Sequence, residues 1–239
     1  MPSSKLIRGG AIGFVLAGLT WLISGLLEAW SSATVPAGPI SQEQVRERIL
    51  NLDITDVLES TVDIVGLLLL ALGLIGLHAL QKESYGRLGR AGFHTALAAT
   101  VVRLLVAAGH LVGMAHLLWR TPLSGLLGSV FLLAVGVVGP PAGFLGSLAG
   151  FALLGVATLR TRILPLWYGT LLIVLEPVAA AYGVRFFIFK PDLLFASLTF
   201  FPAEVMAFRG PSGIWRGLVL VVLGYVLWRR RGAAPQQPS

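Results

Sequence analysis

Residues 121–159 read TPLSGLLGSVFLLAVGVVGPPAGFLGSLAGFALLGVATL, a run of 39 residues without a charged side chain. A helix needs about 20 apolar residues to cross the hydrocarbon core of a bilayer, so this run nearly suffices for two crossings. Pro140 and Pro141 interrupt it, and proline breaks a helix because it lacks an N–H donor and clashes with the preceding turn. The run predicts a membrane-spanning region, and two topologies are compatible with it. These are a two-span hairpin, or a re-entrant piece followed by one full span from about Ala142.

The composition of the whole chain agrees with a bilayer environment. Hydrophobic residues make up 56% of the 239 residues and charged residues only 12%, whereas soluble domains carry about 25% charged residues. The absence of cysteine excludes disulfides, thiolate nucleophiles, iron–sulfur clusters and cysteine-bearing zinc sites. The net charge of +7 comes from basic residues at the ends of apolar runs. Basic residues at these positions are typical of those that set the orientation of spans in the membrane. We therefore expect no nucleic-acid partner.

Five further apolar runs flank the central one, at residues 9–30, 57–80, 92–119, 165–183 and 212–228. The first run exceeds the apolar core of about 7–15 residues of a signal peptide, so we interpret it as a retained span. The sequence therefore predicts an all-α integral membrane protein with about six transmembrane helices, or seven if the hairpin forms.

The polar segments predict a single bundle over residues 1–231. Residues 31–56 form an outer loop with a short amphipathic surface helix, because Ser41 and Gln44 have the spacing of a capping box. Residues 185–211 are rich in Phe and interrupted by Pro and charges, which predicts an interfacial helix. The tail at 232–239 has nothing to bury and is expected to be disordered.

The basic residues favour six spans, with both termini in the cytoplasm of a cell-membrane protein. Six spans place ten Lys and Arg residues inside: Lys5, Arg8, Lys82, Arg87, Arg90, Arg160, Arg162, Arg229, Arg230 and Arg231. Seven then lie outside: Arg46, Arg48, Arg120, Arg185, Lys190, Arg209 and Arg216. Seven spans would place nine basic residues inside and eight outside, which fits the positive-inside rule less well. Arg216 is near enough to the end of the last span to snorkel to the interface.

Ionisable residues within the spans are the candidate functional residues, because burying a charge in lipid is costly. Arg103 and Glu176 each lie eleven residues from the inner end of their span, a depth of roughly 16 Å. This equal depth predicts an ion pair between the third span and the span that begins at Pro165. With Asp63 and His110 they form a predicted intramembrane polar core. Three more residues are expected at the outer rim: Glu28, Glu59 and His116.

The polar core has two interpretations. It is a functional site, such as a proton path, a metal site or a polar substrate pocket, or it is a set of structural ion pairs and hydrogen bonds that fix helix packing. A haem would need facing histidines from different helices, a condition that only His78 and His94 meet. The atoms of His110, His116, Asp63 and Glu59 suit zinc but lack a recognisable ligand spacing. We therefore expect no metal, no cofactor and no catalytic residue.

One segment carries a family resemblance. Residues 155–174, GVATLRTRILPLWYGTLLIV, show a span that ends in Arg, a short loop with Leu-Pro, and Trp-x-Gly at the start of the next span. This pattern resembles several families of uncharacterised bacterial multi-pass membrane proteins. The resemblance implies the fold class and no activity.

Three classes of function follow from these features. We expect first a non-enzymatic bundle, which either packs as an accessory or scaffold subunit against other membrane subunits or binds a lipid or another hydrophobic ligand. The nearly aliphatic spans favour it, since Asn51 is the only Asn of the chain. The alternative is a small proton-coupled transporter that uses the intramembrane Arg, Glu, Asp and His. The third is a metal- or haem-dependent membrane enzyme. The expected partners are the bilayer, other membrane subunits or further copies of the chain.

Overall fold

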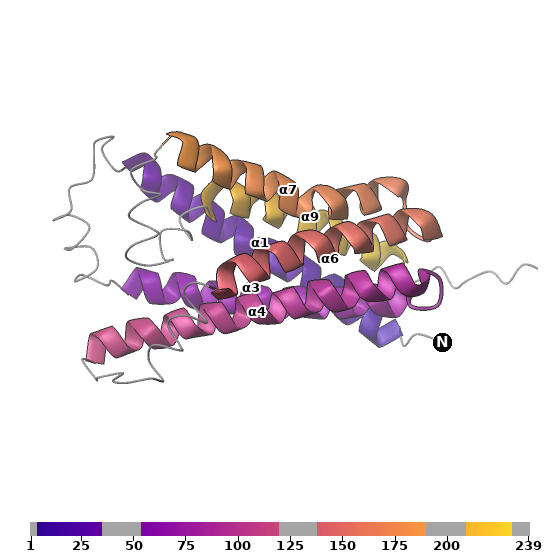
Figure 1. The fold of residues 1–239 in the computed structure, drawn as a ribbon, viewed down its shortest axis with the longest axis horizontal. Coiled ribbons are helices and arrows are strands. Elements are labelled where there is room, and N and C mark those ends of the chain that lie inside the picture. Colours follow the sequence, from indigo (N-terminus) through magenta and orange to yellow (C-terminus); the bar gives the residue numbers. More distant parts are fainter. Residues whose placement is uncertain (1–3, 35–53, 120–137, 190–208, 231–239) are drawn as a thin grey trace, which may run out of the picture.

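The computed structural model describes residues 4–34, 54–119, 138–189 and 209–230, and within them the regular structure is helical (Figure 1). The helices are α1 (Ser4–Thr34), α3 (Ile54–Gln81), α4 (Gly86–Trp119), α6 (Gly139–Thr161), α7 (Leu166–Phe189) and α9 (Arg209–Arg230). Five of them are long and apolar enough to cross a membrane, and α7 adds a shorter apolar stretch, Leu166–Ala181. The predicted all-α membrane fold is confirmed.

The helices form a closed ring. Each packs against its neighbours along the chain, and α1 packs against α9, which joins the two ends of the series. Glycine contacts show that α1 and α9 run in opposite directions, because Gly18 lies beside Gly217 whereas Gly25 lies beside Gly213. The Arg8 guanidinium lies 5.1 Å from the Trp228 ring, so the first and last described helices have their free ends on the same side.

That side of the ring carries the exposed basic residues and is called the basic end below. It includes the start of α1, the α3–α4 turn, the α6–α7 turn and the end of α9, which lie together in Figure 1. Its basic residues within the described part of the chain are Lys5, Arg8, Lys82, Arg87, Arg90, Arg160, Arg162, Arg229 and Arg230. All of them are exposed. The opposite half of the bundle is called the far half.

The direction of α6 distinguishes the two predicted topologies of residues 121–159. Gly143 lies against Arg103, Gly150 against Ala96, and Gly92 against the backbone of Leu154, so α6 runs antiparallel to α4. A two-span hairpin would make them parallel. The antiparallel packing is the arrangement that the six-span interpretation requires. The predicted re-entrant piece falls in 120–137, outside the described residues.

Several helix boundaries differ from the prediction. Pro140 and Pro141 lie in the first turn of α6, where no backbone N–H is needed, so they start this helix and do not form a loop. Arg162 ends it with a left-handed φ of 52°. The chain reverses between α3 and α4 within residues 82–85, and Gly86, with φ of 61°, already begins α4. The predicted interfacial segment from 185 starts later, because α7 continues to Phe189.

The predicted outer loop is also shorter, since α1 extends to Thr34 and α3 begins at Ile54. The predicted amphipathic helix around Ser41, most of the Phe-rich segment and the tail at 232–239 lie outside the described residues.

Small residues allow close packing of the helix backbones. A Cβ atom on Gly10 would lie 2.4 Å from the Cα of Gly76, so α1 and α3 touch backbone to backbone. Gly9, the preceding residue of α1, faces open space. Close backbone approach is the main way in which helices associate in lipid, where the hydrophobic effect between helices is absent.

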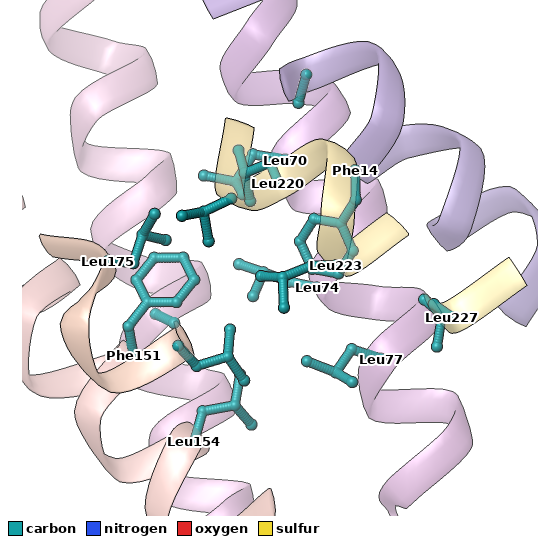
Figure 2. Close-up of a cluster of buried hydrophobic side chains, with 14 of the residues drawn as sticks. Phe14, Leu70, Leu74, Leu77, Phe151, Leu154, Leu175, Leu220, Leu223 and Leu227 are labelled. Carbon is teal, nitrogen blue, oxygen red and sulfur yellow. The ribbon is translucent and has the colours of Figure 1, made fainter. Parts of the chain in front are cut away.

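The centre of the ring is filled with large apolar side chains. Figure 2 shows labelled side chains from α1, α3, α6, α7 and α9 converging on one interior. The largest fully buried ones are Phe14, Phe151, Tyr168 and the leucines Leu70, Leu74, Leu77, Leu154, Leu172, Leu175, Leu220, Leu223 and Leu227. Around these side chains, the interior that the structure describes is a packed apolar core.

Candidate functional site

An ion cluster lies in the core of the far half. Its centre is the Glu176 carboxylate on α7, which is only 2% exposed. It accepts a hydrogen bond from the Arg103 guanidinium of α4 at 3.3 Å and another from the Arg216 guanidinium of α9 at 2.7 Å. The two arginine side chains are 22% and 18% exposed. One carboxylate thus joins three helices.

The surrounding helices hold each member of this cluster in place. A Cβ atom on Gly143 would lie 2.7 Å from the Arg103 Cγ atom, so this glycine leaves room for the arginine stem. The Arg103 guanidinium lies 5.8 Å from the Trp21 ring, within cation–π range. On the other side, the Trp215 indole donates a hydrogen bond of 3.1 Å to the Leu175 carbonyl and ties α9 to α7 beside Glu176.

Asp63 on α3 balances the charge of the cluster. It has a favourable electrostatic interaction with Arg103, and its side chain is half-buried. Two arginines and two carboxylates give a formal charge of zero. A buried group of charges persists in lipid only when its members neutralise one another, and this cluster meets that condition.

The predicted contact between Arg103 and Glu176 is present, but the interpretation of Arg216 was wrong. Arg216 was expected to snorkel to the interface from the end of the last span. Instead, α9 begins at Arg209, and the Arg216 side chain enters the core and binds Glu176. The sequence indicates the depth of Arg216 correctly when it is counted from the other end of α9. Arg216 lies thirteen residues before Arg229, roughly 20 Å in depth, close to the depth of the other two charges.

The remaining predicted site residues contribute no described contact to the cluster. His110 and His116 belong to α4, Glu28 to α1 and Glu59 to α3, but their side chains lie outside the described part of the structure. Their roles in the polar core and at the outer rim remain predictions.

A second buried polar group lies near the basic end and is neutral. The Thr158 hydroxyl donates a hydrogen bond of 3.1 Å to the Gln81 side-chain oxygen, and both residues are buried. The Gln81 amide nitrogen and the Tyr168 hydroxyl are buried without a hydrogen-bond partner among the described residues. Tyr168 precedes Glu176 by eight residues on α7, so roughly 12 Å of leucine-rich core separates this group from the ion cluster.

Two hollows open on the surface of the basic end. The first has a volume of about 420 Å³ and lies between α7 and α9, lined by Pro165, Trp167, Val222, Tyr225, Val226, Arg229 and Arg230. It is called the α7–α9 groove. The second, called the histidine hollow, has a volume of about 550 Å³ and lies at the α3–α4 turn, lined by His78, Lys82, Glu83, Arg90 and His94.

The two histidines that were considered for haem meet in this second hollow. The His78 and His94 ring centroids are 6.4 Å apart, and His78 stacks on Phe93 at 4.1 Å. Tyr85, which the sequence did not single out, hydrogen-bonds His78 through its hydroxyl. Burial raises the pKa of Tyr85 to about 12, so its hydroxyl stays protonated near neutral pH. Within the described ranges, no three His, Asp or Glu side chains are grouped closely enough to hold a metal ion.

The apolar helices, the packed centre and the neutralised internal charges together define an all-α, multi-pass membrane protein. Comparisons with protein-family models, with curated proteins and with solved structures found no match to this chain.

Proposed function

We propose that this chain is a non-enzymatic membrane bundle that binds a phospholipid in the α7–α9 groove. The groove itself carries the proposal, because it combines an apolar wall with a basic rim. Trp167, Val222 and Tyr225 are exposed toward the surrounding lipid, and Arg229 and Arg230 stand at the end of the groove. Basic pockets between transmembrane helices suit anionic lipid headgroups.

The rim has a fixed geometry that supports headgroup binding. The Arg229 guanidinium lies 4.9 Å from the Tyr225 ring, so the ring holds it at the edge of the apolar wall. Trp167 lies at the start of α7, at the level where Trp residues gather in membrane interfaces. An acyl chain would lie along the wall while the phosphate meets the two arginines.

The orientation of the bundle in the cell membrane belongs to this proposal. Nine exposed basic residues gather at the end where the described chain starts and stops. The positive-inside rule then places both termini in the cytoplasm. Reporter fusions after Lys82, Arg120 and Arg231 should read inside, outside and inside, and an external reporter at Arg231 would contradict this orientation.

The test of lipid binding uses the full chain purified in mild detergent, with retained lipids measured by native mass spectrometry. Replacing Arg229 and Arg230 by Gln should lower the retention of anionic phospholipid about fivefold for each arginine, because one basic residue contributes about 1 kcal/mol at an anionic surface. The matched control replaces Arg160 and Arg162, which lie at the same end but not in the groove. Equal loss in both double variants would contradict the groove as the site. Stoichiometric co-purification of another membrane protein would favour the accessory-subunit function.

A small proton-coupled transporter is the second candidate, and the ion cluster favours it, since intramembrane charges often mark proton paths. The leucine-rich core between Glu176 and Gln81 argues against a proton path along the bundle. Proteoliposomes with a pH-sensitive dye separate the two functions. A proton flux that Glu176→Gln abolishes would support transport. An absorption spectrum and a metal analysis test the third class, a metal or haem enzyme.

A further inference from the structure

The histidine hollow has features that membrane topology alone does not explain. Basic residues at the inner ends of spans are ordinary topology determinants. Such residues need neither a concave surface nor a part-buried hydrogen-bonded pair beside it. Here Lys82 and Arg90 line the same hollow as two histidines, and Tyr85, only 5% exposed, holds one of these histidines from behind.

The charges in the hollow favour an anion. Lys82 and Arg90 form no ion pair with an acid among the described residues, and both act electrostatically on His78. Glu83 is the one acidic side chain in the lining. Two permanent cations, two imidazoles and one carboxylate leave a net positive charge, which repels a metal cation and attracts a phosphate group.

The hydrogen bond of His78 also determines which of its ring atoms is free to bind. The Tyr85 hydroxyl and Nδ1 of His78 share a hydrogen bond, so Nε2 is the ring nitrogen that remains for a ligand. When the Tyr85 hydroxyl is the donor, the neutral imidazole carries its hydrogen on Nε2, because the partner of one ring nitrogen sets the state of the other. Stacking on Phe93 fixes the ring plane. In that tautomer, Nε2 of His78 can donate a hydrogen bond to a phosphate oxygen.

We propose that the histidine hollow binds a phosphate group through Lys82, Arg90, His78 and His94. The ligand is either inorganic phosphate or a phosphate-bearing lipid headgroup of the adjoining leaflet, which offer the same oxygens. The site is separate from the α7–α9 groove and shares no residue with it.

The experiment uses the full chain in nanodiscs of phosphatidylcholine, so that no anionic lipid competes. Arg229 and Arg230 are replaced by Gln in this experiment, so that the α7–α9 groove does not bind the anionic lipid probe. Two probes are titrated separately, inorganic phosphate and dioctanoyl phosphatidic acid, and binding is measured by calorimetry. At least one should bind with one-to-one stoichiometry. Binding of phosphate alone identifies a soluble ligand, and binding of the phosphatidic acid alone identifies a headgroup. If neither binds, the proposal is overturned.

The matched variants are Arg90→Gln and Arg87→Gln, since both arginines are exposed in the first turns of α4 but only Arg90 lines the hollow. Arg90→Gln and Lys82→Gln should each weaken binding about tenfold, the loss of one charge-assisted hydrogen bond. Arg87→Gln should change it less than about twofold, because exposed charges are screened by salt. Equal losses of affinity from Arg87→Gln and Arg90→Gln would mean that diffuse surface charge, and not a defined site, binds the phosphate. That result would overturn the proposal.

A spectroscopic measurement tests the role of His78 independently of affinity. Nitrogen-15 NMR of the histidine rings should show His78 with its hydrogen on Nε2, and the signal should shift when the probe binds. His94→Gln should weaken binding while leaving this signal of the free protein in place. Zinc binding to His78 and His94 without any phosphate binding would overturn the proposal. The groove variants at Arg229 and Arg230 should leave phosphate binding unchanged, so this test can fail without the proposed function failing.

Discussion

The ion cluster of the far half and the neutral polar group near the basic end solve the same problem differently. Both place polar side chains in a leucine-rich core. Glu176 accepts a hydrogen bond from each of two arginines, whereas the Gln81 side chain has one partner, and its buried amide nitrogen has no described partner. Within the described residues, the charges of the cluster are paired, although the Arg216 Nε also lacks a described hydrogen-bond partner. This contrast fits the much higher cost of burying an unpaired charge.

The largest expected effect is the loss of the shared carboxylate. Glu176→Gln leaves two arginine side chains in the core without their main counter-charge, and we expect a loss of about 3–5 kcal/mol in the free energy of unfolding. Thermal unfolding of the detergent-purified protein measures it. Glu83→Gln, an exposed acid at the α3–α4 turn, is the control and should change stability little.

The two arginines should differ from each other. Arg216→Leu removes the shorter contact, 2.7 Å, and Arg103→Leu the longer one, 3.3 Å. Each leaves Glu176 with one partner, so each should cost less than Glu176→Gln, and Arg216→Leu should cost more than Arg103→Leu. The same unfolding assay ranks them, and a reversed order would mean that contact distance does not govern the cluster.

Removing all three charges tests whether the cluster stabilises the fold or serves a function. The triple variant Arg103→Leu, Glu176→Leu and Arg216→Leu leaves only the half-buried Asp63 of the cluster, fewer charges than Glu176→Gln leaves. Apolar replacement of buried ion groups is often nearly neutral. We expect its unfolding temperature to exceed that of Glu176→Gln. A triple variant as unstable as the sum of the singles would show that the three side chains do not act as a unit.

The neutral group should respond much less. Thr158→Val removes the donor to Gln81 and should cost about 1 kcal/mol, the usual net value of one hydrogen bond. Gln81→Leu also removes the amide nitrogen that has no described partner, so its cost should be smaller than that of Thr158→Val. A cost of Gln81→Leu comparable to that of Glu176→Gln would remove the contrast between the two regions.

An effect confined to high pH is expected from Tyr85. Its pKa is raised to about 12 in the folded protein, against about 10 in an unfolded chain. The unfolded state therefore loses this proton first, and the stabilising contribution is complete below about pH 10 and is lost as the pH rises toward 12. Unfolding temperatures measured across this interval should fall less in Tyr85→Phe than in the unaltered protein.

The sequence predicts most of the fold and only part of the site. The apolar runs predict the spans, and the equal depth of Arg103 and Glu176 along their helices predicts their contact. Arg216 was misassigned because its distance was counted from the near end of α9, and a span boundary at 212 hid the extra turn from Arg209. The Tyr85–His78 contact was missed because it depends on a four-residue turn whose left-handed glycine, Gly86, the sequence does not mark as such. The rotation of a helix about its axis decides where a side chain points, and the depth of a residue along the helix does not predict that rotation.

The closure of the ring by α9 has a consequence for biosynthesis. This helix leaves the ribosome after the other five described helices, yet it makes the most extensive contact with α1, the earliest of them. Until it inserts, the glycine-lined face of α1 lies against lipid or an insertion factor, and Glu176 has Arg103 without Arg216. Insertion of α9 thus both joins the two ends of the described ring and gives Glu176 its second arginine. A nascent chain stopped before residue 209 would be an open, incompletely neutralised intermediate, of the kind that membrane quality control removes.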